Sequence, residues 1–142
     1  MNWKIITLLV LIVVALSIAS LTGMINSDYI FLYMLVTAVI SGVIIAKTCH
    51  RMVFMHGVVA GLLGGVFGSV IQSLFFDTYL KNNPTSLDGF KNLTTSLDPV
   101  YVVLFSGPFI GIAYGIVVGA VAYILHGLFK NKGQSTSKNY NR

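Results

Sequence analysis

The chain has 142 residues, enough for one domain, with 56% hydrophobic and only 9% charged residues. A soluble domain carries about 25% charged residues, and one with this composition would expose large apolar patches. The net charge of +5 comes from a few cations scattered between apolar runs. The sequence lacks the basic stripe of a nucleic-acid-binding protein, so we expect no nucleic-acid partner.

Four long apolar runs contain no Asp, Glu, Lys or Arg, and crossing the hydrocarbon of a membrane takes about 20 helical residues. The runs are Ile5–Ile25, Tyr29–Ala46, Met52–Phe76 and Val100–Phe129. In lipid each backbone polar group must be satisfied within its own segment, which favours helices. Strict two-residue alternation is absent, which disfavours a membrane barrel. We therefore predict an all-α membrane protein with four transmembrane helices in one domain, residues 1–130.

The first run has a second interpretation as a cleaved signal peptide. Lys4 precedes an apolar core, and the small residues Ser17-Ile18-Ala19 resemble a cleavage site. The apolar run continues to Ile25, longer than a usual signal core, so we favour a span. Cleavage would leave the other three runs unchanged.

The connections and the charges predict the orientation. Residues 26–28 and 47–51 form connections so short that the helices they join must be antiparallel neighbours, whereas the third connection, Asp77–Asp98, is longer and polar. One side carries seven cations and no acid: Lys4, Lys47, Arg51, Lys130, Lys132, Lys138 and Arg142. The other side carries Lys81, Lys91 and all four aspartates. Because cytoplasmic loops are enriched in Lys and Arg, we predict a cell-membrane protein with both termini in the cytoplasm.

The ends of the fourth run carry recognisable signals. Asp98 followed by Pro99 is typical of a helix N-cap and first helical residue. Thirty residues would extend about 45 Å, beyond a core of about 30 Å. Either the helix tilts and projects, or it breaks at Pro108, which cannot donate a backbone hydrogen bond. The polar tail, Asn131–Arg142, is predicted to be disordered.

Small residues recur every fourth position in two of the runs. The third run carries Gly57, Gly61, Gly65, Ser69 and Ser73, with Gly64 and Gly68 beside them, and the fourth carries Gly107, Gly111, Gly115 and Gly119. Residues four apart share one helix face, so each series forms a groove along which helices approach closely. We predict that these glycine ladders pack the helices of an antiparallel bundle. The alternative is that one ladder forms an oligomer interface or lines a narrow pore.

A few polar residues within the runs are candidates for function. His56 and His126, with Cys49 and His50 nearby in sequence, could form a metal site or a proton-sensitive gate, although their spacing matches no metal motif and amphipathic rings favour the membrane interface. We predict no metal. Gln72 is the only amide within a run, and an interhelical hydrogen bond with Ser69, Ser106 or a backbone group is favoured over solute binding.

The sequence contains none of the common catalytic motifs, so we predict no enzymatic activity and no cofactor. No charged residue lies in the middle of a run, which argues against a proton-coupled exporter. The third connection carries one glycosylation sequon, Asn92-Leu93-Thr94.

The segment His56–Gly65 reads HGVVAGLLGG, and Asn2-Trp3-Lys4 precede the first run. In both features the chain resembles an uncharacterised family of small membrane proteins from methanogenic archaea, over roughly the first 80 residues. The resemblance implies membrane residence and four helices, and it assigns no functional residue. The 22-residue connection Asp77–Asp98 and Pro108 depart from the family's pattern.

Three functions are compatible with these features. The leading hypothesis is a non-enzymatic membrane component that self-associates or binds other membrane proteins through its ladders. The alternative is a small oligomeric channel or facilitator for ions or small solutes. A third hypothesis is an envelope accessory protein whose basic tail, Lys130–Arg142, contacts anionic lipid.

Overall fold

A computed structural model describes residues 1–25, 29–84 and 98–139, with side chains placed up to Lys130. The elements of this part are all helices: α1 (Trp3–Leu21), α2 (Ile30–Thr48), α3 (Val53–Leu74), α4 (Phe76–Asn82) and α6 (Pro99–Asn139). Four of them, namely α1, α2, α3 and the Pro99–Lys130 part of α6, are long and apolar enough to cross a membrane. The predicted all-helical class with four candidate spans is confirmed.

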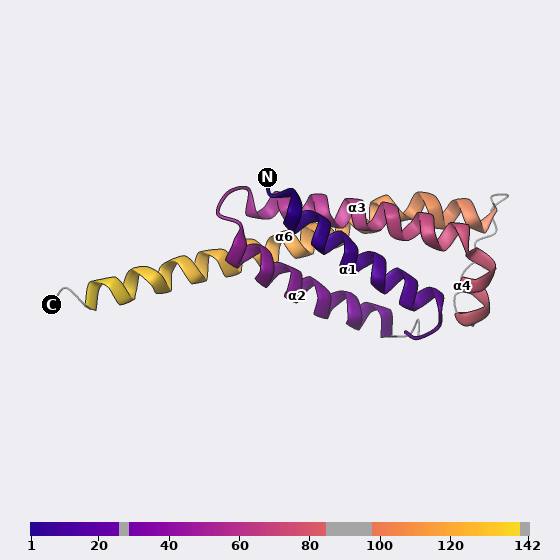
Figure 1. Ribbon diagram of the computed structural model, residues 1–142, viewed down its shortest axis with the longest axis horizontal. Helices are drawn as coiled ribbons and strands as arrows, with labels where there is room; N and C mark the ends of the chain where they lie inside the picture. Colours follow the sequence, from indigo (N-terminus) through magenta and orange to yellow (C-terminus); the bar gives the residue numbers. More distant parts are fainter. Residues whose placement is uncertain (26–28, 85–97, 140–142) are drawn as a thin grey trace.

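The helices are arranged around a central pair. The most extensive contact is between α3 and α6, while α1 packs mainly on α3 and α2 packs mainly on α6. Figure 1 shows α3 and α6 lying along each other, with α1 and α2 crossing in front of them. The N-terminus lies at the end of the bundle from which α6 projects, and α4 lies at the opposite end. We call these the N-terminal end and the α4 end.

Glycines bring α3 and α6 into backbone contact. A Cβ added to Gly57 would lie 2.6 Å from the Cα of Gly119, and one added to Gly61 would lie 2.5 Å from the carbonyl oxygen of Gly111. A Cβ on Gly65 would meet Gly107 and Gly111. The residue numbers of the α6 partners fall as those of the α3 glycines rise. Real Cβ atoms essentially never approach within 3.0 Å, so only glycine fits here.

The first span ends earlier than its apolar composition predicts. The prediction extended it to Ile25, but α1 ends at Leu21. Gly23 has a φ of +73°, the Gly23 N–H donates to the carbonyl of Ser20, and the Met24 N–H donates to the carbonyl of Ala19. This pair of bonds is the Schellman motif, which a glycine in the left-handed conformation closes. The prediction was wrong here because hydropathy alone does not indicate where a glycine ends a helix.

A short helix follows the third span, where the sequence predicted only a polar connection. α4 has Asp77 in its first turn and Lys81 in its last, the arrangement that the helix dipole favours. Just after it, the Asn83 side-chain N–H₂ donates to the carbonyl of Ser20 at 2.9 Å, and the Asn82 side chain donates to the carbonyl of Leu21 at 2.9 Å. The last carbonyls of a helix have no partner within it, so these asparagines complete the end of α1.

The fourth span begins as predicted but does not break. The carboxylate of Asp98 accepts a hydrogen bond from the Val100 N–H at 3.0 Å, which confirms the N-cap. Of the two alternatives that the sequence left open, α6 follows the first: it projects beyond the other helices and is helical on both sides of Pro108 and through it. Proline removes one hydrogen-bond donor, and the backbone packing of α6 on α3 continues at Gly107 and Gly111.

The helix also continues where the sequence predicted disorder. α6 extends to Asn139, so nine residues of the predicted tail, 131–139, are helical. Residues 130–139 contain no proline, so the backbone hydrogen bonds of the helix can continue past Lys130. Figure 1 shows this last part of α6 projecting beyond the other helices.

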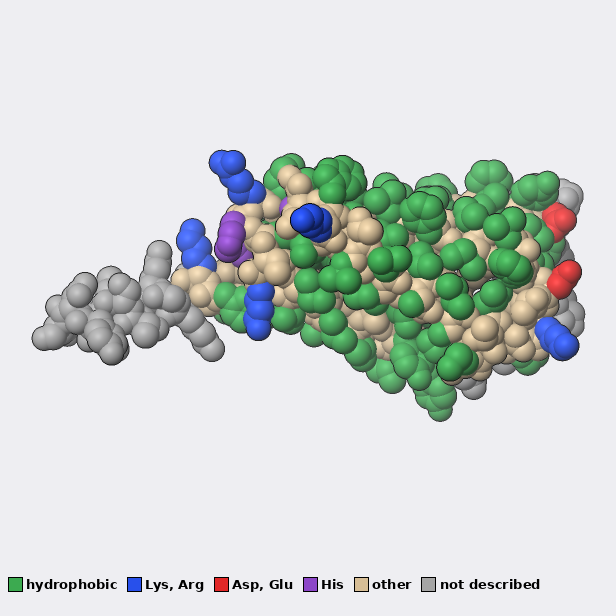
Figure 2. All heavy atoms as spheres, in the orientation of Figure 1, with side chains coloured by type: hydrophobic (Ala, Val, Ile, Leu, Met, Phe, Trp, Pro, Cys, Tyr) green, Lys and Arg blue, Asp and Glu red, His purple; other side chains and the backbone are tan. Residues whose placement is uncertain are grey.

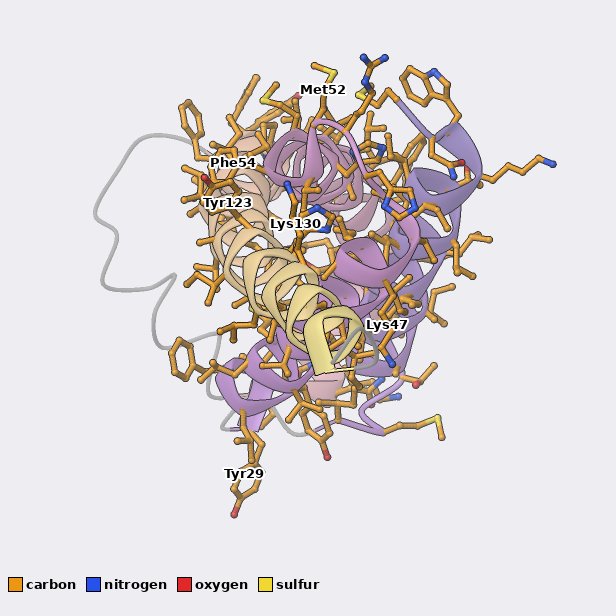
Figure 3. All side chains as sticks on the ribbon, turned by 90° about the vertical axis from the view of Figure 1, so that its left-hand side faces the viewer. Tyr29, Lys47, Met52, Phe54, Tyr123 and Lys130 are labelled. Atoms are coloured by element: carbon orange, nitrogen blue, oxygen red, sulfur yellow. The ribbon has the colours of Figure 1, made fainter. Side chains whose placement is uncertain are left out.

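The surface between the two ends is apolar. Figure 2 shows hydrophobic side chains covering the middle of the visible face, with Lys, Arg and His at one end and Asp with Lys at the other. In the end-on view of Figure 3, Phe54 and Tyr123 point outward on one side and Tyr29 points away on another. Tyr29 and Tyr123 expose 58% and 68% of their surface. An apolar surface of this extent is stable in lipid and not in water.

Candidate functional site

A cavity of about 350 Å³ lies between all four long helices, in the half of the bundle nearer α4. Its lining runs along α1 from Val13 to Ser20 and along α2 from Ile30 to Thr37. Seven residues of helix rise about 10 Å, so the cavity extends roughly a third of the way into a membrane core of about 30 Å from the level of Ser20. Its volume falls at the lower end of the ligand pockets of proteins, about 300–1,000 Å³.

Glycines create this space. Gly61, Gly64, Gly65 and Gly68 of α3 line the cavity, and so do Gly107 and Gly111 of α6. Without side chains, α3 and α6 present bare backbone to the interior. On the flank, Gly64 receives the side chain of Val13, because a Cβ on this glycine would lie 3.0 Å from the Cβ of Val13. The same glycines therefore bring the helices together and leave a hollow beside the contact.

Four serine hydroxyls line the cavity, and three of them are bonded to their own helices. Ser17 donates to the carbonyl of Val13 at 3.1 Å, Ser69 to Val66 at 3.0 Å and Ser106 to Val103 at 3.0 Å. A hydroxyl that donates to a carbonyl three or four residues earlier in its own helix needs no acceptor from another helix or from a ligand. Each oxygen keeps acceptor capacity for a guest molecule. These three serines therefore make the lining mildly polar without leaving their own donors unpaired.

The cavity lining carries no charge. Its lining residues include no Asp, Glu, Lys, Arg or His, and its remaining polar side chains are Tyr33, Thr37, Gln72, Tyr79 and Tyr114 together with Ser20. A charged group inside a low-dielectric site needs a partner of opposite charge. The described lining provides none for a cation or for an anion, so the site is suited to an uncharged molecule.

The inner end of the cavity is closed by a tyrosine. The hydroxyl of Tyr114 on α6 donates to that of Thr37 on α2 at 3.2 Å. A void of about 10 Å³ lies beyond the cavity and shares Val13, Gly61 and Tyr114 with its lining. This volume is at the lower limit of the space that can hold one water molecule. Past this void lies the buried core, which includes Ile6, Leu9, Ile45 and Val118. The cavity is thus blocked toward the N-terminal end.

Of the residues that the sequence singled out, several meet at this site. Gln72 lines the cavity, and its two predicted side-chain partners, Ser69 and Ser106, are bonded to carbonyls of their own helices instead. The lining includes four ladder glycines, Gly61, Gly65, Gly107 and Gly111. It does not include Gly57, Gly115 or Gly119. Ser69 lies against Gly107.

The histidines lie elsewhere, at the N-terminal end. His56 is buried, its Nε2 accepts a hydrogen bond from the Asn2 N–H at 2.8 Å, and its Nδ1 lies 2.8 Å from the Met52 carbonyl oxygen. These two contacts correspond to the neutral ring with its proton on Nδ1. His56 therefore ties the start of α1 to the start of α3, a structural role.

The other two histidines lie near each other and apart from the cavity. The rings of His50 and His126 have centroids 6.2 Å apart, and the Nδ1 of His126 lies 3.1 Å from the carbonyl oxygen of Ala46. Beside them, the ammonium of Lys47 lies 5.9 Å from the ring centroid of Phe129. Figure 3 shows Lys47 and Lys130 at this end of the bundle. Within the described ranges, no three His, Cys, Asp or Glu side chains are grouped closely enough to hold a metal ion.

Sequence reasoning missed Ser20, Thr37 and Tyr114. Hydroxyl residues are common in membrane helices, and nothing in their spacing separates the ones that face a cavity from the ones that face lipid. A weak signal exists, because Ser17 and Ser20 lie on one face of α1.

Asn92, the predicted glycosylation site, lies outside the described residues. In comparisons with protein-family models, curated proteins and solved structures, the chain has no match.

Proposed function

We propose that the chain is a multi-pass membrane protein that binds a small uncharged molecule between its helices and facilitates its passage through the membrane. One observation carries this proposal, the uncharged cavity of about 350 Å³ that the four long helices enclose. Ligand sites of helix bundles lie between the helices, with mostly apolar walls and a few polar groups that orient the ligand.

Passage requires a second conformation in which the inner end of the cavity opens. The hydrogen bond between Tyr114 and Thr37 joins α6 to α2 at that end. α2 packs mainly on α6 and makes few contacts with α1. A movement of α2 relative to α6 at this end of the cavity would break the bond. Alternating between two closures around a central site is the usual route through small transporters.

The topology belongs to the same proposal. We infer an antiparallel bundle held by the glycine ladders of α3 and α6, in the cell membrane, with both termini in the cytoplasm. The described side chains at the N-terminal end include Lys4, Lys47, Arg51 and Lys130, and the α4 end includes Asp77 and Asp98. The positive-inside rule assigns the first group to the cytoplasm. The cavity then lies in the outer half of the membrane.

The proposal is for a binding and facilitating protein without catalytic activity. Self-association through the ladders, the leading hypothesis from the sequence, would need faces that α3 and α6 already present to each other. An oligomer would have to form through other, lipid-facing surfaces. The likeness to the archaeal family remains a prediction, and the proposal does not depend on it.

The test is solute flux into liposomes that contain the purified protein. Stopped-flow light scattering should show glycerol entering faster than into protein-free liposomes, while K⁺ and Cl⁻ remain at background. Ser106→Leu, which enlarges a side chain in the lining, should lower the glycerol rate. Tyr123→Phe, at a position that is 68% exposed, is the matched control and should leave the rate unchanged. Glycerol flux at background in correctly folded protein would overturn the proposal.

A further inference from the structure

Two buried polar atoms at the α4 end of the bundle have no hydrogen-bond partner among the described residues, and one of them belongs to a residue of the cavity lining. They are the hydroxyl oxygen of Ser20 and the side-chain carbonyl oxygen of Asn83, and each residue exposes only 1% of its surface. Buried polar atoms are nearly always paired in folded proteins. The two lie beside each other in the fold, because the Asn83 amide nitrogen is bonded to the Ser20 backbone.

The orientation of the Asn83 amide follows from its neighbours. Its nitrogen donates to the carbonyl oxygens of Ser20 at 2.9 Å and Tyr79 at 3.0 Å. The reversed amide would place an oxygen against two carbonyl oxygens, which is repulsive. The unpaired atom of Asn83 is therefore an acceptor, and it lacks a donor.

Ser20 differs from the neighbouring serine in the same lining. Ser17 is bonded to the carbonyl of Val13, whereas the hydroxyl of Ser20 has no partner among the described residues. Ser20 itself belongs to the cavity lining, whereas Asn83 does not. A hydroxyl of a bound molecule that meets Ser20 can donate to it or accept from it, and would give the unpaired Ser20 hydroxyl a partner.

The rest of the cavity is suited to an apolar chain. Between Ser20 and Tyr114, the apolar side chains that line the cavity include Leu16, Met34, Val103 and Ile110. The glycines of α3 and α6 contribute bare backbone to the lining. The volume of about 350 Å³ corresponds to roughly a dozen groups of water size, at about 30 Å³ each. The distance along α1 from Ser20 to Val13 is about 10 Å. These dimensions fit a ligand with one short alkyl chain.

We infer that the molecule bound in this cavity is an uncharged single-chain amphiphile, with a hydroxyl head at Ser20 and its chain directed toward Tyr114. The inference rests on the proposed function for the existence of a binding cavity and adds the class and orientation of the ligand. The head group then lies nearer the membrane surface than the chain does. An amphiphile has the same orientation in the lipid from which it would enter the cavity.

The experiment uses 1-octanol that carries a diazirine, photolysed with the full chain in liposomes, with labelled residues located by mass spectrometry. Labelling should map to the cavity lining. Competition at equal membrane concentration should follow the head group, with 1-octanol displacing the probe at least tenfold better than octanoate, octylammonium or octane. Ser20→Ala should weaken competition by 1-octanol about fivefold, the effect of one neutral hydrogen bond.

Ser17→Ala is the matched control, because this hydroxyl is already bonded to its own helix, and it should change competition less than twofold. Equal competition by all four octyl compounds, or equal effects of the two serine variants, would overturn the inference while leaving a binding cavity in place. Labelling confined to lipid-facing residues would overturn both the inference and the proposed function. Unfolding midpoints of the variants within a few degrees of the unmodified chain verify that folding is not the cause.

Discussion

Replacing Gly61 by alanine tests whether the bundle depends on backbone contact between α3 and α6. The new Cβ would lie 2.5 Å from the carbonyl oxygen of Gly111 and 2.5 Å from the backbone nitrogen of Gly115. Ordinary contact begins at 3.4 Å, so the helices must separate by about 0.9 Å, the difference between 3.4 and 2.5 Å. Backbone atoms cannot rotate away as a side chain could.

The expected cost follows from the lost contacts. A gap of 0.5–1 Å removes a quarter to a half of the dispersion energy of each atom pair that it opens, and overpacking typically costs about 1–3 kcal/mol. The neighbouring contacts at Gly57 and Gly65 open with it, so we expect a loss near 3 kcal/mol in the free energy of unfolding. This is about a hundredfold in the equilibrium constant.

Gly127→Ala is the matched control, because a Cβ at this position on the same central pair meets nothing within 4 Å. Alanine favours a helix over glycine by up to about 1 kcal/mol, so this variant should be neutral or slightly stabilised. The assay is reversible unfolding in mixed micelles, followed by circular dichroism against the mole fraction of denaturing detergent. Equal unfolding free energies for the two variants would refute the reasoning.

Three further substitutions test individual bonds. Asn83→Ala removes the donor to the Ser20 carbonyl at the end of α1 and should lower the unfolding free energy by about 1–2 kcal/mol in the same assay. Tyr114→Phe removes the bond to Thr37 and should raise glycerol flux in liposomes, because the inner closure loses the side-chain bond that joins α6 to α2 there; an unchanged or lower flux would contradict the closure. Pro108→Ala restores a backbone donor within α6 and should stabilise the protein by about 1 kcal/mol, whereas destabilisation would show that the proline is required.

The sequence alone determined the helices and their approximate length. A run of about 20 apolar residues has one stable form in hydrocarbon, so composition was sufficient for four candidate spans. The start of α6 was also predictable, because Asp98 and Pro99 act on the backbone next to them. The end of the first span was misjudged, because the left-handed Gly23 ends α1 before Ile25. The sequence left open whether α6 breaks at Pro108, and this residue lies within an uninterrupted helix.

Only the tertiary structure decided where the site lies. Ser20, Thr37 and Tyr114 belong to three different helices, and no spacing within one helix indicates that their side chains surround the same space. The cavity arises because α1 and α2 lie on different members of the central pair and the glycines between them have no side chains to fill the gap. Small residues at fixed spacing indicate that a helix can be approached closely, while the three-dimensional packing decides whether a neighbour or a hollow occupies that face.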